Sequence, residues 1–172
     1  MIEFKKSLTG ETVTEELLQE FEATMESPLP QDYRQHMLDY NGGIKAKDGF
    51  LYYTKYESEE GELVLKSLHH FKGGGGGSVV HYSKSFDFLP KAIDIGSIYG
   101  GILSMSLADN DYGHIYMQFS DTDPEKVANS FTEFLEGLEY DEQTIIIFKS
   151  ILVVLFLLLL EVDQGNNSIN WN

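Results

Sequence analysis

The order of apolar patterns along the chain predicts an α+β fold. Two stretches with helical spacing come first, several stretches rich in β-forming residues follow, and one more helical stretch closes the set. Helices packed on one sheet bury the apolar faces of all these elements together. The 172 residues, 42% of them hydrophobic, are enough for a real core. We predict a single antiparallel-rich sheet with N-terminal helices and a closing C-terminal helix packed on it, in one domain at 1–140, with an apolar C-terminal extension and polar tail at 141–172.

The first helix is predicted from Thr14 to Met25. Its apolar face consists of Leu17, Leu18, Phe21 and Met25. Thr12 and Glu15 have the spacing of a capping box, which satisfies backbone N–H groups at the start of a helix. The prolines at 28 and 30 then separate this helix from the next one.

The second helix is predicted over residues 30–40 with both of its ends marked. Pro30 has the fixed φ that suits a helix start, and Asp32 places negative charge in the first turn. Asn41-Gly42-Gly43 offers residues that tolerate the left-handed conformation at a helix end. Tyr33, Met37 and Tyr40 share one stripe, and the solvent-facing side is predicted to carry Arg34, Gln35 and Asp39.

Five runs rich in β-forming residues predict the strands of the sheet. They lie at 50–56, 63–71, 90–96, 102–107 and 114–119. The first two form a hairpin across a charged turn, and the last two form a hairpin across the turn at 109–113. The run at 102–107 alternates apolar and hydroxyl residues, which is typical of a half-buried strand.

The closing helix is predicted to start at Asp123, with Pro124 in its first position. Its buried face is predicted to consist of Val127, Phe131, Phe134, Leu135 and Leu138.

Two segments have unusual composition. Residues 73–77 are five consecutive glycines, whose backbone entropy predicts a loop. No Gly-Lys-Ser/Thr follows them, so they do not match a phosphate-binding loop. Residues 144–160 are almost continuously apolar apart from Lys149. This run is somewhat short for a bilayer span and has no cluster of basic residues beside it. It fits a buried terminal element, a membrane-associating tail anchor, or a surface for self-association.

No catalytic or metal-binding motif stands out. His69 and His70 are adjacent on a predicted strand, so their rings should point to opposite faces and cannot hold one metal ion together. His36 is predicted to lie on the helix surface beside Asp32. The Asp109–Gly113 segment lacks the glutamate that ends a calcium loop and is better explained as a hairpin turn. We predict a non-enzymatic protein with no cofactor and no metal.

The net charge of −16 restricts the classes of partner. Nucleic-acid binding needs a basic surface, so it is disfavoured here. A strongly acidic protein suits rapid, electrostatically steered association with a basic protein. The chain has no cysteine and no apolar secretory signal near its start, which predicts a cytoplasmic protein.

Three motifs occur in a characteristic order: the helix at 29–43, the hairpin at 109–116 and the helical pattern at 127–138. This order resembles the SUKH superfamily, which includes fungal cell-wall assembly regulators and bacterial immunity proteins against polymorphic toxins. The resemblance covers residues 14–140 and implies the same helices-on-a-sheet layout. It also implies a protein-binding function, either as an immunity protein that occludes the active site of a basic, nuclease-like toxin domain or as an intracellular scaffold or regulator of envelope assembly.

Exposure and charge, rather than any family motif, select the candidate contact residues. We expect carboxylates on two exposed turns and one aromatic anchor to meet the partner. These candidates are Glu57, Glu59, Glu60, Asp109, Asp111 and Tyr112.

Overall fold

The computed structural model describes residues 2–47, 49–55, 63–73, 77–83 and 89–141. The chain divides into two compact units, Met1–Glu139 and Tyr140–Asn172. The apolar run at 144–160 lies outside the described residues. Within the described ranges, no helix is both long enough and apolar enough to cross a bilayer.

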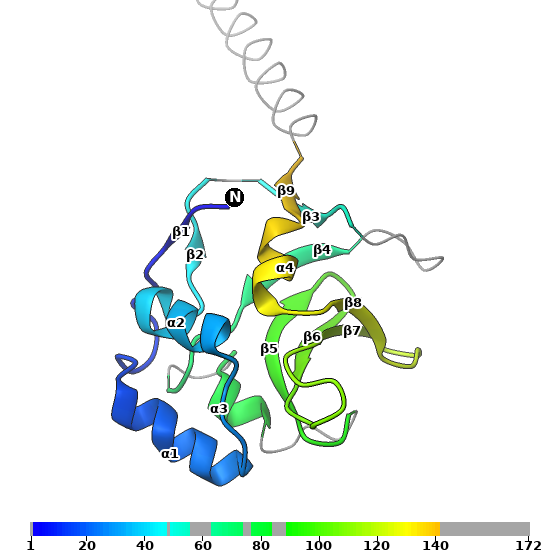
Figure 1. The fold of residues 1–172 in the computed structure, drawn as a ribbon. Helices are drawn as coiled ribbons and strands as arrows, with labels where there is room; N and C mark the ends of the chain where they lie inside the picture. Colours follow the sequence, from blue (N-terminus) through cyan, green and yellow to red (C-terminus); the bar gives the residue numbers. More distant parts are fainter. Residues whose placement is uncertain (1, 48, 56–62, 74–76, 84–88, 142–172) are drawn as a thin grey trace, which may run out of the picture. The chain divides into compact units, whose positions relative to one another are not determined.

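A seven-stranded sheet forms the centre of the first unit and confirms the predicted α+β class (Figure 1). Its order is β8-β7-β6-β5-β4-β3-β9, and the pairings from β3 through β8 are antiparallel. The strands are β3 (Leu51–Tyr53), β4 (Val64–Leu68), β5 (Ala92–Ile98), β6 (Gly101–Ser106), β7 (Ile115–Phe119), β8 (Glu125–Ala128) and β9 (Leu138–Tyr140).

A separate two-stranded ribbon was not predicted from the sequence. It joins β1 (Phe4–Lys5) to β2 (Ile44–Lys45), with Phe4 opposite Lys45 and Lys5 opposite Ile44. Two residues per strand are too few to produce a recognisable alternation, so the ribbon follows from tertiary pairing rather than from local pattern.

The helices are α1 (Glu15–Met25), α2 (Gln31–Tyr40), α3 (Val79–Tyr82) and α4 (Phe131–Glu136). The predicted capping box at Thr12 is wrong, because Thr14 is the N-cap and its hydroxyl accepts from the Leu17 N–H at 3.3 Å. The predicted end of α2 is confirmed, since Asn41 adopts a left-handed φ of 51°.

The closing helix is shorter than predicted. Asp123 and Pro124 precede strand β8 instead, and the helix starts after Ser130, whose hydroxyl accepts from the Glu133 N–H at 3.1 Å. Residues 125–128 complete their backbone hydrogen bonds with β7, which a helix over the same residues would prevent. The apolar residues assigned to one helix face are therefore divided among β8, α4 and β9.

Aromatic side chains fix α4 between the sheet and α2. Phe134 stacks on Tyr53 with ring centroids 5.2 Å apart, and Phe131 meets Tyr33 edge to face at 5.0 Å. The Tyr53 hydroxyl donates to the Val127 carbonyl oxygen at 2.9 Å. All four rings are buried, so this cluster holds the closing helix on the sheet.

Buried Asn41 connects three separate segments. Its Nδ2 donates to the Thr9 carbonyl oxygen at 3.0 Å and the Glu11 carbonyl oxygen at 3.4 Å, while its Oδ1 accepts from the Phe71 N–H at 2.8 Å. The next residue, Gly42, lies so close to the sheet that a Cβ there would approach the His69 carbonyl oxygen to 2.3 Å. The end of α2 is thus locked to the N-terminal segment and to the chain after β4.

The prediction that His36 lies on the surface is wrong. Its ring is buried against Phe131 and Phe4, and Nε2 lies 2.9 Å from the Gly42 carbonyl oxygen. Burial disfavours the charged imidazolium and lowers the pKa of His36. A polar residue between Gln35 and Met37 can turn inward because the backbone at the helix end supplies its hydrogen-bond partner.

Candidate functional site

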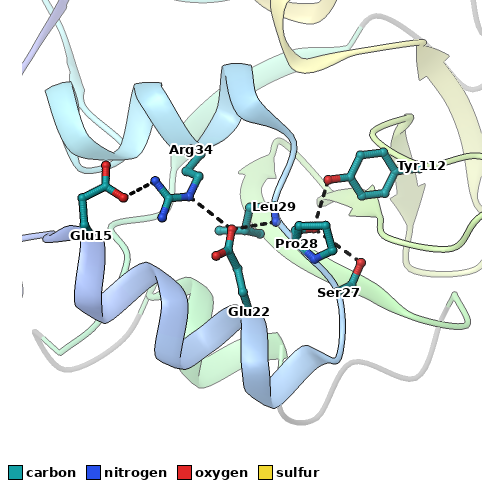
Figure 2. Close-up of polar contacts among 7 residues, drawn as sticks. All are labelled: Glu15, Glu22, Ser27, Pro28, Leu29, Arg34 and Tyr112. Carbon is teal, nitrogen blue, oxygen red and sulfur yellow. Dashed lines mark hydrogen bonds and ion pairs between the residues drawn. The ribbon is translucent and has the colours of Figure 1, made fainter.

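An ion-pair network joins α1 to α2, within the motif at 29–43 (Figure 2). Arg34 pairs with Glu15 and places its Nε 3.2 Å from Oε1 of Glu22. The same Glu22 oxygen accepts from the Leu29 N–H at 2.9 Å. Arg34 was predicted to face solvent, but its side chain is only 14% exposed because its guanidinium spans both carboxylates. The network fixes the loop that enters α2.

The turn between β6 and β7 contacts this loop. The Tyr112 hydroxyl donates to the Pro28 carbonyl oxygen at 3.1 Å, and the tyrosine remains 41% exposed (Figure 2). Ser27 adds a second contact between the loop before α2 and the chain after β6, because its hydroxyl donates to the Leu107 carbonyl oxygen at 3.3 Å. Partial burial and the nearby carboxylates of Glu22 and Asp32 raise the pKa of Tyr112 above its ordinary value.

Asp111 shapes the turn from within. Its two carboxylate oxygens accept from the Ser106 hydroxyl and the Tyr116 hydroxyl, each at 2.6 Å. Partial burial opposes ionisation of Asp111, but these two hydrogen bonds outweigh it and the pKa lies below its usual value. In return, partial burial and the bond to Asp111 raise the pKa of Tyr116 to about 12. The Asp111 charge is therefore directed into the turn.

The predicted contact residues fall into two groups. Glu57, Glu59 and Glu60 lie outside the described residues. Asp109, Asp111 and Tyr112 share one turn, where Asp109 and Tyr112 are exposed and Asp111 is half-buried.

Two further carboxylates, Glu22 and Asp32, lie near the Tyr112 hydroxyl. Asp32 also accepts from the N–H and the hydroxyl of Thr132 at 2.8 and 3.0 Å, which connects α2 to α4. We call Glu22, Asp32, Asp109 and Tyr112 the Tyr112 face. Sequence reasoning missed Glu22 and Asp32 as members because they are far from the turn along the chain.

A second polar cluster, also missed from the sequence, lies where the chain leaves β4 beside the middle of β5. Nε2 of His69 lies 3.0 Å from the Ser97 hydroxyl, and Nδ1 lies 3.3 Å from Oδ1 of Asp94. His69 and His70 follow β4 rather than lying within it, and both are buried. The ring of His70 contacts the Gly73 carbonyl oxygen, so the two rings have separate partners.

The order serine, histidine, aspartate is that of a nucleophilic triad, but the electrostatics do not suit one. Burial and the neighbouring His70 lower the pKa of His69 to about 4, and burial raises the pKa of Asp94 to about 7. An imidazole with so low a pKa is a weak base at neutral pH. Its Nδ1 also makes no hydrogen bond, whereas a triad needs that nitrogen to be oriented by the carboxylate. Within the described ranges, no group of three or more potential metal ligands occurs.

Comparison with known proteins gives one family assignment. The model of the SMI1 / KNR4 family (SUKH-1) matches residues 12–137, well over half of the chain. No curated protein matches the sequence. The matched range begins before α1 and ends after α4, so it contains the ion-pair network, the Tyr112 face and the buried His69 cluster. The chain therefore belongs to the SMI1 / KNR4 family (SUKH-1).

Proposed function

We propose that this protein is a cytoplasmic immunity protein that binds a basic, nuclease-like toxin domain and blocks its active site without chemistry. Family membership supports a protein-interaction or immunity-type role. The observation that carries the finer proposal is the Tyr112 face, an exposed aromatic ring surrounded by carboxylates.

The composition of the Tyr112 face suits a protein interface. Tyrosine is enriched among the residues that dominate binding energy, since its ring covers a large area and its hydroxyl can stay hydrogen-bonded. Three carboxylates accompany the ring, but Glu22 is paired with Arg34. Asp32 and Asp109 therefore supply most of the negative charge that matches the cationic groups with which a nuclease holds a phosphate backbone.

The Tyr112 face is also held in place before a partner arrives. Tyr112 donates to Pro28, Asp32 accepts from Thr132, and Glu22 accepts from Leu29. Side chains that hydrogen bonds already hold in one conformation lose less conformational entropy when a partner binds.

Tyrosine substitutions test the face directly. The chain is co-expressed with a toxin domain encoded beside its gene, and growth rescue and the Kd of the complex are measured. We expect Tyr112→Ala to weaken binding by at least about tenfold, as loss of an interface anchor does. Tyr99→Ala is the matched control, because Tyr99 is 53% exposed on another turn. Equal effects of the two substitutions would contradict the proposed face.

Charge reversal provides a second test of the Tyr112 face. Asp109→Lys should slow association with the toxin domain, whereas Asp121→Lys changes the net charge equally on a different exposed turn. Failure of the wild-type chain to bind the toxin domain or rescue growth would contradict the immunity function. Recovery of the chain with the cell envelope in that case would favour the alternative role as a scaffold or regulator of envelope assembly.

A further inference from the structure

A hollow of about 350 Å³ lies where the N-terminal segment meets the ends of β4 and β5. Its volume is within the range of small-ligand sites. The polar side chains around it come from three parts of the chain and include Ser7, Thr9, Lys66, Ser67, His69 and Ser97.

The charge of this hollow is opposite to that of the protein as a whole. The chain carries 28 acidic and 12 basic residues, yet among the residues that the structure describes no Asp or Glu lines the hollow. Lys66 is exposed and belongs to none of the ion pairs formed by the described residues. Among the described residues, no carboxylate therefore competes with a ligand for its ammonium group.

Hydroxyl groups supply hydrogen-bond donors beside Lys66. The Ser7 hydroxyl oxygen accepts from the Thr9 N–H at 3.2 Å, which leaves its own proton to donate. When neutral His69 carries its proton on Nε2, it donates to Ser97, and the Ser97 hydroxyl can then donate to a ligand. Burial raises the pKa of Asp94 behind His69 to about 7, so below that pH this neighbour adds no opposing negative charge.

Exposed apolar side chains accompany the polar groups. Ile44 and Tyr82 line the hollow and are 57% and 37% exposed. Apolar surface next to a polar floor suits an extended peptide, whose side chains alternate in direction.

We propose that this hollow binds a carboxylate side chain within an extended acidic segment of a protein partner, with Lys66 as its counter-ion. Apolar residues on either side of that carboxylate contact Ile44 and Tyr82. One lysine with several hydroxyls matches the single charge of a carboxylate, whereas a phosphate group usually recruits arginine or several cations.

This site is independent of the proposed function because it selects the opposite charge. The Tyr112 face binds a basic partner, so salt weakens that association. At the hollow, the net charge of −16 repels an acidic peptide over long distances, while Lys66 attracts it at contact. Salt screens the long-range repulsion more strongly, so peptide binding should resist added salt.

The test titrates the isotope-labelled full chain with the blocked peptide acetyl-Leu-Glu-Leu-amide, followed by NMR. We expect the backbone amides of Ser67, His69 and Ser97 to shift, and the matched Leu-Gln-Leu peptide to shift them far less. Lys66→Glu should weaken binding at least about tenfold, whereas Lys126→Glu, the same charge change on β8, should stay within about twofold.

Four outcomes would overturn the proposal. The Glu and Gln peptides could shift the amides equally, the shifts could occur away from the hollow, or Lys66→Glu could bind as wild type does. Inorganic phosphate that saturates the same amides at lower concentration than the peptide would assign the hollow to a free anion and also overturn it. None of these outcomes depends on toxin binding at the Tyr112 face.

Discussion

Asn41 shows how one side chain can satisfy several backbone groups at once. It ends α2 in the left-handed conformation, and its amide bonds three main-chain groups from two other segments. Few residues other than Asn and Gly adopt this φ easily, and Gly has no side chain to form the bonds. Both requirements are therefore met only by asparagine or a close analogue.

Substitution of Asn41 separates its two roles. Asn41→Gly keeps the backbone conformation and loses the side-chain bonds, whereas Asn41→Ala loses both. We expect Asn41→Ala to lower the free energy of unfolding by about 2–4 kcal/mol, since buried main-chain groups lose their partners. Asn41→Gly should be less damaging, and urea titration measures both. An Asn41→Ala variant as stable as wild type would show that the three bonds contribute nothing.

His69 and Asp94 make opposite contributions to the pH dependence of stability. The pKa of Asp94 rises from 3.8 in the unfolded chain to about 7, so its contribution is present at low pH and is lost as pH rises through about 7. The pKa of His69 falls from 6.5 to about 4, so its contribution is present above pH 6.5 and is lost as pH falls through about 4. Between pH 4 and 6.5, the contribution of Asp94 to stability falls as pH rises, while the contribution of His69 increases.

The difference between a variant and wild type isolates the contribution of the group that was removed. In Asp94→Asn, the free energy of unfolding relative to wild type should rise between about pH 4 and 7, where Asp94 titrates in wild type. In His69→Gln, it should fall between pH 4 and 6.5, where His69 titrates in wild type. Urea titrations at several pH values measure both. Parallel pH profiles for the two variants would show that the pair does not titrate in this way.

At the scale of elements, Arg34 determines how α1 and α2 are joined. Both Arg34 and Glu22 are mostly shielded from water, with side chains 14% and 17% exposed, while Glu15 is 52% exposed. We expect Arg34→Met to cost about 1–3 kcal/mol, because Glu22 is left partly buried without its cation. Glu15→Gln should cost less than about 1 kcal/mol, as exposed pairs do. Thermal and urea unfolding compare the two, and equal costs would contradict the difference in burial.

Elements with complete local signals were predictable from the sequence. Helix α2 has a proline at its start and Asn-Gly-Gly after its end, and β6 and β7 alternate across a turn rich in Asp, Asn and Gly. Strand β8 was not predictable, because its apolar residues also fit the period of the helix that follows. Pairing with β7 decides its conformation, and local propensity cannot report such pairing.

At the scale of the whole molecule, charge should govern partner binding. With a net charge of −16, the chain should associate with a basic toxin domain faster at low salt than at high salt. Raising the salt from about 20 to about 300 mM should mainly lower the association rate and change the dissociation rate less. Stopped-flow measurements separate the two rates. A salt-independent association rate would remove the electrostatic part of the proposal and leave the binding function itself open.

Only the turn residues of the candidate site were predictable from the sequence, and the carboxylates contributed by other segments were not. Asp109 and Tyr112 were predictable because a turn between two strands is exposed. The inward direction of Asp111 depends on Ser106 and Tyr116 on the neighbouring strands. Glu22 and Asp32 join the face only because the Pro28 carbonyl oxygen meets Tyr112, 84 residues away along the chain. Contacts at this separation leave no signal in a single sequence.

The position of β9 beside β3 imposes an order of events on folding. Thr54 bonds the Gly137 carbonyl oxygen across a separation of 83 residues. Closing so large a loop is entropically costly, so this pairing forms late, after the local hairpins. During synthesis, β3 leaves the ribosome long before β9. Until β9 is made, the edge of β3 that later pairs with β9 has no partner. That interval is when the nascent chain is most exposed to pairing with another copy, and when a chaperone would protect it most.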